Sequence, residues 1–480
     1  MVHDKKYDVV IVGTGFASAF FLKRVLEGSD VSRVLVLERG QRHSYDWQLD
    51  HQRNNDLADR RPHNEAGLEK KFWNYNIGFG GGSNCWWTNT MRIHPEEFEL
   101  RTRYGVGDDW PISYEDLEPY YCDAEDEMLV SGDNSSAVLF PRSRPFPQPR
   151  HRYSGVGSAL KMAYPEHTFA MPTTRARVAN DSRGVCCAIG RCNLCPNKAK
   201  FTIVEEMAYL FDDPRVTLIL DAEVDGIETS AGLASAVTYR KGDRAFRVET
   251  DFVALGANGI FNPFILLKSG IDDGPVGRGV VEQIPIYLTV DFETAKTEGY
   301  SSFVGAVNYS FSTGPHRRNA SGGFLEVVNK FEVRPHKEKW NNRAAFTFLM
   351  GDMRQDDNRV TIDPDAPDRP LVSFNDWSPY AYNGVAHIRT NIENFLAPLG
   401  VERFEVSYDL IGSHSHIEGT TVMGSDPAAS VVDKDLLHHR VRNLAVLGSG
   451  AFVTSPGSNP TLTIAAMSLR SADRTILGRA

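Results

Sequence analysis

Two polar residues near the C-terminus have the side chains that alcohol oxidation requires. His416 lies in the segment SHSHIEGTTVMG and Asn459 in the segment SPGSNPTLTIAA. A neutral imidazole can accept the proton of a hydroxyl group near pH 7. An asparagine amide can hydrogen-bond to the alkoxide that develops on the substrate. Alone, Asn459 could equally be a helix cap, because Pro460 and TLTIAAMSLRSADRTI favour a helix that begins there.

The N-terminal segment predicts a dinucleotide site that could accept the hydride of such a reaction. Residues 7–13 (YDVVIVG) are typical of a buried parallel strand, and GTGFAS then leads into a helix. A second strand, Arg33–Leu37, ends at Glu38. Gly13 permits a tight turn, Gly15 lets a pyrophosphate approach the helix N-terminus, and Glu38 can accept hydrogen bonds from a ribose. Phe16, Ala17 and Arg39 adjoin these residues in the sequence and are further predicted cofactor contacts. The fingerprint alone does not show whether the dinucleotide is FAD or NAD.

The composition is that of a globular protein of two domains or one large two-part domain. Of its 480 residues, 41% are hydrophobic and 24% are charged, and the net charge is −10. This charge argues against a nucleic-acid surface, which needs a basic stripe. We see neither a signal peptide nor an apolar run of membrane-spanning length, and therefore expect a cytoplasmic protein without a transmembrane segment. The proline-bearing run 141–149 predicts an exposed linker.

Four of the six cysteines lie close together in the sequence. Cys186, Cys187, Cys192 and Cys195 follow the spacing CC-x4-C-x2-C, and Pro196 comes next. Disulfides are uncommon in the compartment we expect. Four thiolates on one loop suit zinc or an iron–sulfur cluster, and a loop without metal remains an alternative.

Several segments resemble the glucose–methanol–choline (GMC) oxidoreductases. They are GFGGGSNCWW at 78–87, the stretch 92–121, HIEGTTVMG at 416–424 and NPTLTIAA at 459–466. The resemblance is strongest to the branch that holds pyranose oxidase and bacterial FAD-dependent glucose and fructose dehydrogenases. It implies an α/β fold, in which a Rossmann-like FAD-binding domain carries a substrate domain based on a β-sheet. The expected FAD domain is discontinuous, at 1–150, 180–285 and 405–480, with the substrate domain at 286–404.

The resemblance also implies which residues hold FAD. The glycine run would pass beside the isoalloxazine, where missing side chains allow close approach of the backbone. Cys85 stands where pyranose-oxidase-like members carry a His bonded to flavin, so either a cysteinyl link or a small residue near the ring is expected. The full set adds Gly81, Gly82, Asn84, Val224, Ala257, Gly450, Ala451, Asn459, Pro460 and Thr461.

In this family the counterpart of His416 takes the hydroxyl proton, the counterpart of Asn459 assists it, and hydride passes to flavin N5. In the related dehydrogenases three cysteines hold a [3Fe-4S] cluster, so this cluster type is favoured here over [4Fe-4S]. We therefore expect a dehydrogenase for a small alcohol, sugar, polyol, glycoside or aminosugar. Its electrons would leave through the cluster to an acceptor protein or small subunit. An oxygen-using oxidase and a lyase with non-redox flavin are the alternatives.

Overall fold

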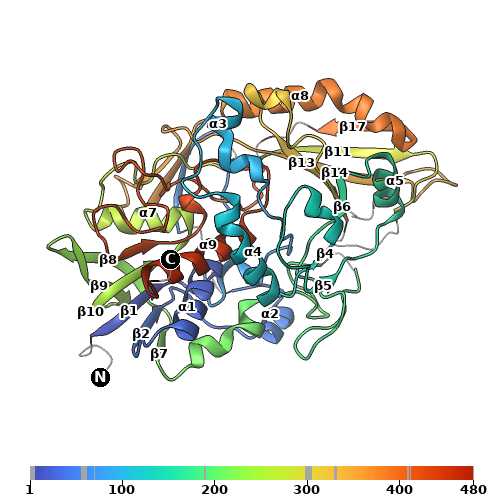
Figure 1. Cartoon of the computed structure of the whole chain (residues 1–480). Coiled ribbons are helices and arrows are strands. Elements are labelled where there is room, and N and C mark those ends of the chain that lie inside the picture. Colours follow the sequence, from blue (N-terminus) through green and yellow to red (C-terminus); the bar gives the residue numbers. More distant parts are fainter. Residues whose placement is uncertain are drawn as a thin grey trace.

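The computed structural model describes residues 6–55, 62–69, 71–188, 191–297, 305–328, 332–407, 410 and 412–478. Figure 1 shows a sheet with helices beside it at the N-terminal end of the chain, and a second sheet under a long helix. The strands of the first sheet come from the two ends and the middle of the sequence. The division into a discontinuous FAD domain and a substrate domain stays a prediction.

The first sheet has the strand order β7-β2-β1-β10-β9-β8, with β18 paired to β10. Strands β1, β2, β7 and β18 run parallel to their neighbours, and β8 and β9 are antiparallel. The first half of β10 pairs with β9 and the second half with β1, so a single strand joins the two styles of pairing. The bounds are β1 Tyr7–Val12, β2 Val34–Leu37, β7 Val216–Ile219, β8 Glu223–Ser230, β9 Leu233–Lys241, β10 Arg244–Leu255 and β18 Leu444–Val446.

Helices from opposite ends of the chain cover this sheet. Helix α1 (Phe16–Gly28) packs against α9 (Thr461–Thr475), and α9 packs against α4 (Tyr114–Glu127). Phe20 and Phe21 of α1 are fully buried, because the helix joins the apolar core of the sheet. The other helices are α2 Tyr45–His51, α3 Leu100–Tyr104, α5 Gly155–Ala163, α6 Ile203–Glu206, α7 Asn258–Lys268 and α8 Pro379–Leu396.

The second sheet, called here the substrate sheet, has six antiparallel strands in the order β17-β11-β14-β13-β12-β6. One face carries Ile286, Leu288 and Phe348, which share a buried cluster with Ile388 and Phe395 of α8. Alternation along each strand turns the next residues to the opposite face. The bounds are β6 Thr168–Ala170, β11 Ile284–Phe292, β12 Ala306–Asn308, β13 Gly323–Val328, β14 Arg343–Met350 and β17 Val401–Ser407.

The substrate sheet takes strands from outside the expected range 286–404. Strand β6 precedes the cysteine loop in sequence, and β17 continues to Ser407. A third sheet joins β3 (Asn64–Gly67) to β16 (Pro370–Phe374) and β15 (Arg359–Ile362), so a segment near the N-terminus also pairs with the substrate region. Edge pairing between segments distant in sequence leaves no local signal, which is why sequence boundaries missed these strands.

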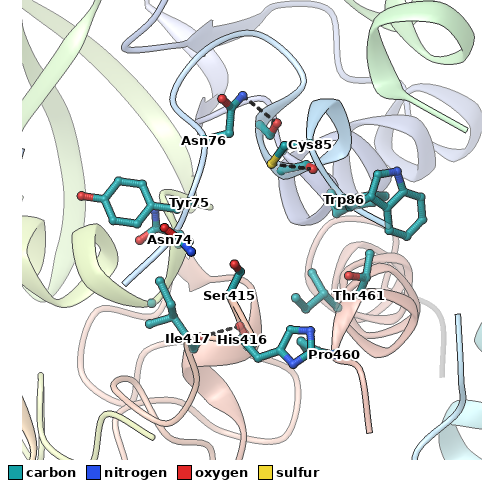
Figure 2. Close-up of a pocket in the computed structure, with 18 of the residues that line it drawn as sticks. Asn74, Tyr75, Asn76, Cys85, Trp86, Ser415, His416, Ile417, Pro460 and Thr461 are labelled. Atoms are coloured by element: carbon teal, nitrogen blue, oxygen red, sulfur yellow. Dashed lines mark hydrogen bonds between the residues drawn. The ribbon is translucent and has the colours of Figure 1, made fainter. Parts of the chain in front are cut away.

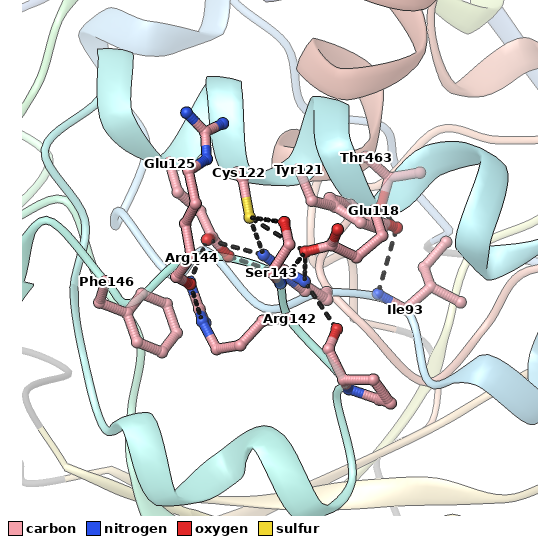
Figure 3. Close-up of polar contacts among 12 residues, drawn as sticks. Ile93, Glu118, Tyr121, Cys122, Glu125, Arg142, Ser143, Arg144, Phe146 and Thr463 are labelled. Carbon is pink, nitrogen blue, oxygen red and sulfur yellow. Dashed lines mark hydrogen bonds and ion pairs between the residues drawn. The ribbon is translucent and has the colours of Figure 1, made fainter.

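The proline-bearing run at 141–149 is largely exposed, as expected, but a few buried side chains attach it to the rest of the molecule. Figure 3 shows Arg142 turned towards Glu125 of α4, and the two side chains form a buried ion pair. Arg92 bonds Glu125 through Nε at 2.8 Å and Nη2 at 2.9 Å, while the Arg142 guanidinium lies over the ring of Phe146. The run ends in β5 (Gln148–Pro149), which pairs with β4 (Ser131–Gly132). Buried charge pairs therefore attach this segment to the flavin side of the molecule.

Candidate active site

A cavity of about 1210 Å³ lies between the first sheet and the substrate sheet. Its walls are the β1–α1 turn, the glycine run after Ile77, the N-terminus of α9 and the open face of the substrate sheet. In the view of Figure 2, His416, Pro460 and Thr461 lie on one side, and Asn76 and Cys85 on the other. The predicted proton acceptor and the predicted flavin-binding residues therefore line the same cavity.

The β1–α1 turn has the backbone geometry of a phosphate-binding site. Gly13 has φ +90°, and a Cβ there would come within 2.7 Å of the Gly256 carbonyl oxygen, so only glycine suits this turn. Gly15 caps α1, whose first N–H groups can bind an anion. Thr14 Oγ1 donates to Glu38 Oε2 at 2.6 Å, and burial raises the pKa of Glu38. A ribose hydroxyl could share this buried carboxyl.

The glycine run lies directly against that turn. A Cβ on Gly81 would come within 2.9 Å of the Gly15 Cα, so the two backbones touch. A Cβ on Gly82 would meet no described atom within 4 Å, because Gly82 faces the cavity. This leaves a smooth backbone wall that a planar ring system could approach. The wall continues through Cys85, whose thiol pKa is raised by burial, and Trp86, whose indole Nε1 donates to the Phe201 carbonyl at 2.9 Å.

His416 and Asn459 come together across the cavity floor. Asn459 Nδ2 lies 3.5 Å from His416 Nε2, and His416 Nδ1 lies 2.6 Å from Gln283 Oε1. Burial lowers the pKa of His416 to about 3, and the neighbouring His414 acts in the same direction. The imidazole is therefore neutral at pH 7 and able to accept a proton.

Gln283, which sequence reasoning missed, decides which ring nitrogen of His416 carries the proton. Its Nε2 donates to the carbonyls of Pro456 at 2.8 Å and Ser458 at 3.0 Å, so its Oε1 must face the histidine. We therefore place the proton of His416 on Nδ1, where it donates to Gln283, and the lone pair on Nε2. Asn459 Oδ1 is buried and has no hydrogen-bond partner among the described residues, which fits a bound group at this point.

A second polar layer lies behind the histidine. Tyr287 OH is 2.9 Å from His414 Nε2, and burial lowers the pKa of His414 to about 4. Glu282 pairs with Lys71 in the interior. His414 is therefore hydrogen-bonded to the substrate sheet through Tyr287. The described residues around it do not form a metal site.

Most of the predicted flavin residues line the cavity, and three do not. Asn84 is buried, where its Nδ2 donates to the Phe79 carbonyl at 2.8 Å. Gly450 and Ala451 lie behind the wall, which is formed instead by their neighbours Gly448 and Ser449. Among the cavity-lining residues are Gly13, Gly15, Phe16, Ala17, Glu38, Arg39, Gly81, Gly82, Cys85, Val224, Ala257, Asn459, Pro460 and Thr461.

The predicted four-cysteine ligand set is not assembled in the described structure. Cys192 and Cys195 are buried, Cys186 is half-buried and Cys187 is exposed, while residues 189–190 lie outside the described part. The described residues hold no group of three or more His, Cys, Asp or Glu side chains placed to bind a metal. The pKa of the Cys186 thiol is raised by burial and by the nearby Cys192 and Cys195. Three of the thiols are therefore neighbours without forming a ligand shell.

Two buried cations stand between the cysteine loop and the flavin side. Arg175 Nη1 donates to Cys192 Sγ at 3.3 Å, and its Nη2 is buried without a partner. Lys200 Nζ donates to the carbonyls of Asn84 at 2.7 Å and Asn193 at 3.1 Å. Burial lowers the pKa of Lys200 to about 8. One lysine thus links the glycine run to the cysteine loop.

Comparison with known proteins agrees with this architecture. The family model described as GMC oxidoreductase matches residues 355–468. The chain is 28% identical to the fructose dehydrogenase large subunit of Gluconobacter japonicus, over 82% of this chain and 80% of the relative. It is 26% identical to the 6'''-hydroxyparomomycin C oxidase of Streptomyces lividus, over 98% and 91%. The solved pyridoxine 4-oxidase from Mesorbium loti superposes with a TM-score of 0.68 at 16% identity, covering 98% of this chain and 99% of that one.

These matches confirm the resemblance to the GMC oxidoreductases that the sequence motifs indicated, and the family model places it in the C-terminal part of the chain. The comparisons confirm the fold class and the oxidoreductase class expected from the sequence. They support alcohol oxidation by a flavoenzyme, and the matched family implies FAD as the cofactor. Within the described residues, no helix combines the length and hydrophobicity needed to cross a bilayer.

Proposed function

We propose that this enzyme oxidises a CH–OH group of a sugar, polyol, glycoside or aminosugar, with hydride passing to flavin N5 and the hydroxyl proton passing to His416. The observation that carries the proposal is the Gln283–His416–Asn459 arrangement. It brings the Nε2 lone pair of His416 and the Nδ2 amide of Asn459, which lie 3.5 Å apart, to the same cavity. The related fructose dehydrogenase, propanediol dehydrogenase and hydroxyparomomycin oxidase support the substrate class by their names.

The residues that line the cavity would hold FAD. The β1–α1 turn and Glu38 suit the pyrophosphate and ribose, and Gly81, Gly82 and Cys85 suit the ring system. FAD bound there supplies the acceptor for a hydride. The N-terminus of α9 at Thr461 borders the same space, and its unpaired N–H groups stabilise negative charge.

His416 and Asn459 would divide the work on the substrate hydroxyl. His416 Nε2 accepts the hydroxyl proton, because Nδ1 already donates to Gln283. Asn459 Nδ2 is placed to donate to the same oxygen as negative charge develops on it. Gln283 holds the ring plane, since its own amide is attached to two backbone carbonyls. Positioning of this kind lowers the entropic cost of the reacting geometry.

The test is an anaerobic screen of alcohols and sugars that follows bleaching of the oxidised flavin. The variant His416→Ala should retain flavin and slow its reduction by about 10²–10⁴-fold, the usual contribution of a general base. His439→Ala, a half-buried histidine that bonds Ser430 away from the cavity, is the matched control. Unchanged reduction by His416→Ala would remove the catalytic assignment. Absence of bleaching with every alcohol would instead favour a non-redox flavin.

We further propose an iron–sulfur cluster at the cysteine loop, with Cys186, Cys192 and Cys195 as its ligands. Thiolates are the donors such clusters take, and the unpartnered Nη2 of buried Arg175 suits an anionic neighbour. Against it, the described side chains do not form a ready ligand shell. This proposal would make the enzyme a dehydrogenase with an external acceptor, whereas the oxidase relative favours oxygen.

Iron and acid-labile sulfide in anaerobically purified protein test the cluster. Cys192→Ser should lose both, while Cys187→Ser, at an exposed cysteine outside the proposed set, should keep them. A wild-type protein without iron or sulfide contradicts the cluster, and rapid reoxidation of its flavin by air would then support the oxidase alternative. Release of all flavin on acid precipitation would exclude a cysteinyl link at Cys85.

A further inference from the structure

A row of polar side chains crosses the open face of the substrate sheet. Tyr287 of β11 pairs with Thr347 of β14, and Thr347 pairs with Glu326 of β13. All three line the cavity. Their sequence neighbours Ile286, Phe348 and Leu325 point into the opposite, apolar core. On the cavity face of the sheet, which also carries Thr289, these three polar groups therefore form a row across the strands.

The row starts beside the catalytic histidine segment and ends at Glu326. Tyr287 OH is 2.9 Å from His414, two residues before His416. Adjacent strands are about 4.8 Å apart, so the two spacings from β11 to β13 cover roughly 10 Å. That span suits one sugar or cyclitol ring with its substituents. A substrate whose reacting hydroxyl lies at His416 could thus reach Glu326 with a remote substituent.

Glu326 is a buried carboxyl with no cation at ion-pair distance among the described residues, although the Arg175 charge acts on it from farther away. It is only 4% exposed, and its Oε1 accepts from Asn89 Nδ2 at 2.9 Å. Burial raises its pKa to about 7, while Asn89 and Arg175 act in the opposite direction. Within the described part of the chain, Glu326 forms no ion pair, and the basic residues of the cavity lining, Arg39 and Arg53, lie off the substrate sheet. A buried carboxylate in this position is stabilised by a cationic ligand.

We propose that Glu326 is a specificity-determining residue that binds a protonated amine of the substrate, remote from the hydroxyl that is oxidised. The substrate class is then an amino-bearing sugar or cyclitol, with Tyr287 and Thr347 bonding its other hydroxyls. The inference rests on the proposed alcohol oxidation at His416 and goes beyond it by naming the group that the far end of the site recognises.

The experiment compares matched ligands on the flavin-loaded enzyme. A panel of sugars and cyclitols is offered anaerobically, each beside a counterpart in which one hydroxyl is replaced by an amine. The wild type should show a KM at least tenfold lower for an amino counterpart. Glu326→Gln, which keeps the shape and removes the charge, should abolish that preference while kcat stays within about threefold. Glu249→Gln, at an exposed carboxyl on β10, serves as the control and should keep the preference.

The outcomes separate the two proposals. Equal KM values for both members of every pair, or an amine preference that survives in Glu326→Gln, overturns the role of Glu326. A variant that raises KM equally for amine and hydroxyl counterparts also overturns it, because the carboxylate would then serve only the fold of the pocket. Spectral titration of the oxidised flavin detects binding without turnover, so an enzyme that binds amines but never bleaches contradicts the alcohol oxidation and leaves Glu326 testable.

Discussion

The cofactor side and the substrate side of the cavity are built by different means. The cofactor wall is made of backbone, at Gly13, Gly15 and Gly81, where one glycine Cα approaches another. The substrate wall is made of side chains that alternate along antiparallel strands and meet across them. A backbone site is specified by residues that lack a side chain, and it changes little with the ligand. A side-chain row can be altered one residue at a time, which suits the part that selects the substrate.

The largest effect should follow a change in the backbone wall. Gly13→Ala introduces a Cβ 2.7 Å from the Gly256 carbonyl oxygen at a φ of +90°. We expect folded protein with at least tenfold less bound flavin, measured as the ratio of flavin to protein absorbance. Gly105→Ala is the control, since it has φ +74° but no described atom near the new Cβ. It should cost only about 1 kcal/mol of stability. Full flavin content in Gly13→Ala would contradict a backbone-built site.

The next effect should come from the residue that orients His416. Gln283→Leu removes the acceptor for His416 Nδ1, and kcat should fall about 10–100-fold, as for other groups that orient a catalytic residue. Gln283→Glu should keep the acceptor and add a negative charge, which raises the pKa of His416. The fall of kcat/KM on the acid side should therefore begin at a higher pH than in the wild type. An unshifted profile would show that Gln283 does not act through the histidine.

A smaller effect should appear in the pH dependence of the substrate wall. Burial raises the pKa of Glu326 to about 7, so the free enzyme carries the carboxylate above that pH and the neutral acid below it. KM for an amino substrate should rise as the pH falls through 7, by up to tenfold per unit, while a hydroxyl counterpart stays flat. The other groups that act on Glu326 are Asn89 and Arg175, and neither changes charge in this range. A KM for the amino substrate that does not change with pH would contradict the role of Glu326 as the partner of the amine.

The smallest effect should lie where β11 ends and β14 begins, outside the cavity. Arg343 and Asp291 form a two-point ion pair at 2.7 and 3.0 Å. Because the arginine is partly exposed, Arg343→Met should lower the free energy of unfolding by at most about 1 kcal/mol. Chemical denaturation measures this change, and KM should not move. A change in KM would mean that strand pairing tunes the polar row after all.

The cofactor side could be predicted from sequence because its signals are local. The order of strand, glycine turn, helix and Glu38 specifies a βαβ unit, and the structure forms it with β1, α1 and β2. His416 and Asn459 were also found from their motifs, although nothing in their spacing shows that the two side chains meet. The strands β3 and β6, which complete sheets far along the chain, carried no such signal.

The proline-bearing run shows what composition leaves out. Most of its residues are exposed, as its composition predicts, but the Arg142 side chain is held in the interior by Glu125 of α4 and lies over the ring of Phe146. The four cysteines are a related case, since regular spacing predicted a ligand set that the described backbone does not gather. Spacing along a chain limits where ligands can go, but it does not decide which side chains point to a common centre.

By itself, the sequence indicated the dinucleotide fingerprint, the resemblance to the GMC family and a candidate proton acceptor, because each depends on residue types that are adjacent in the chain. Only the tertiary structure decided that Gln283 fixes the proton on His416 and that Tyr287, Thr347 and Glu326 share one face. The first relation depends on a contact between residues more than a hundred positions apart in the sequence. The second depends on the register of neighbouring strands. Register arises from the packing of whole sheets, so a single strand cannot reveal which residue stands opposite.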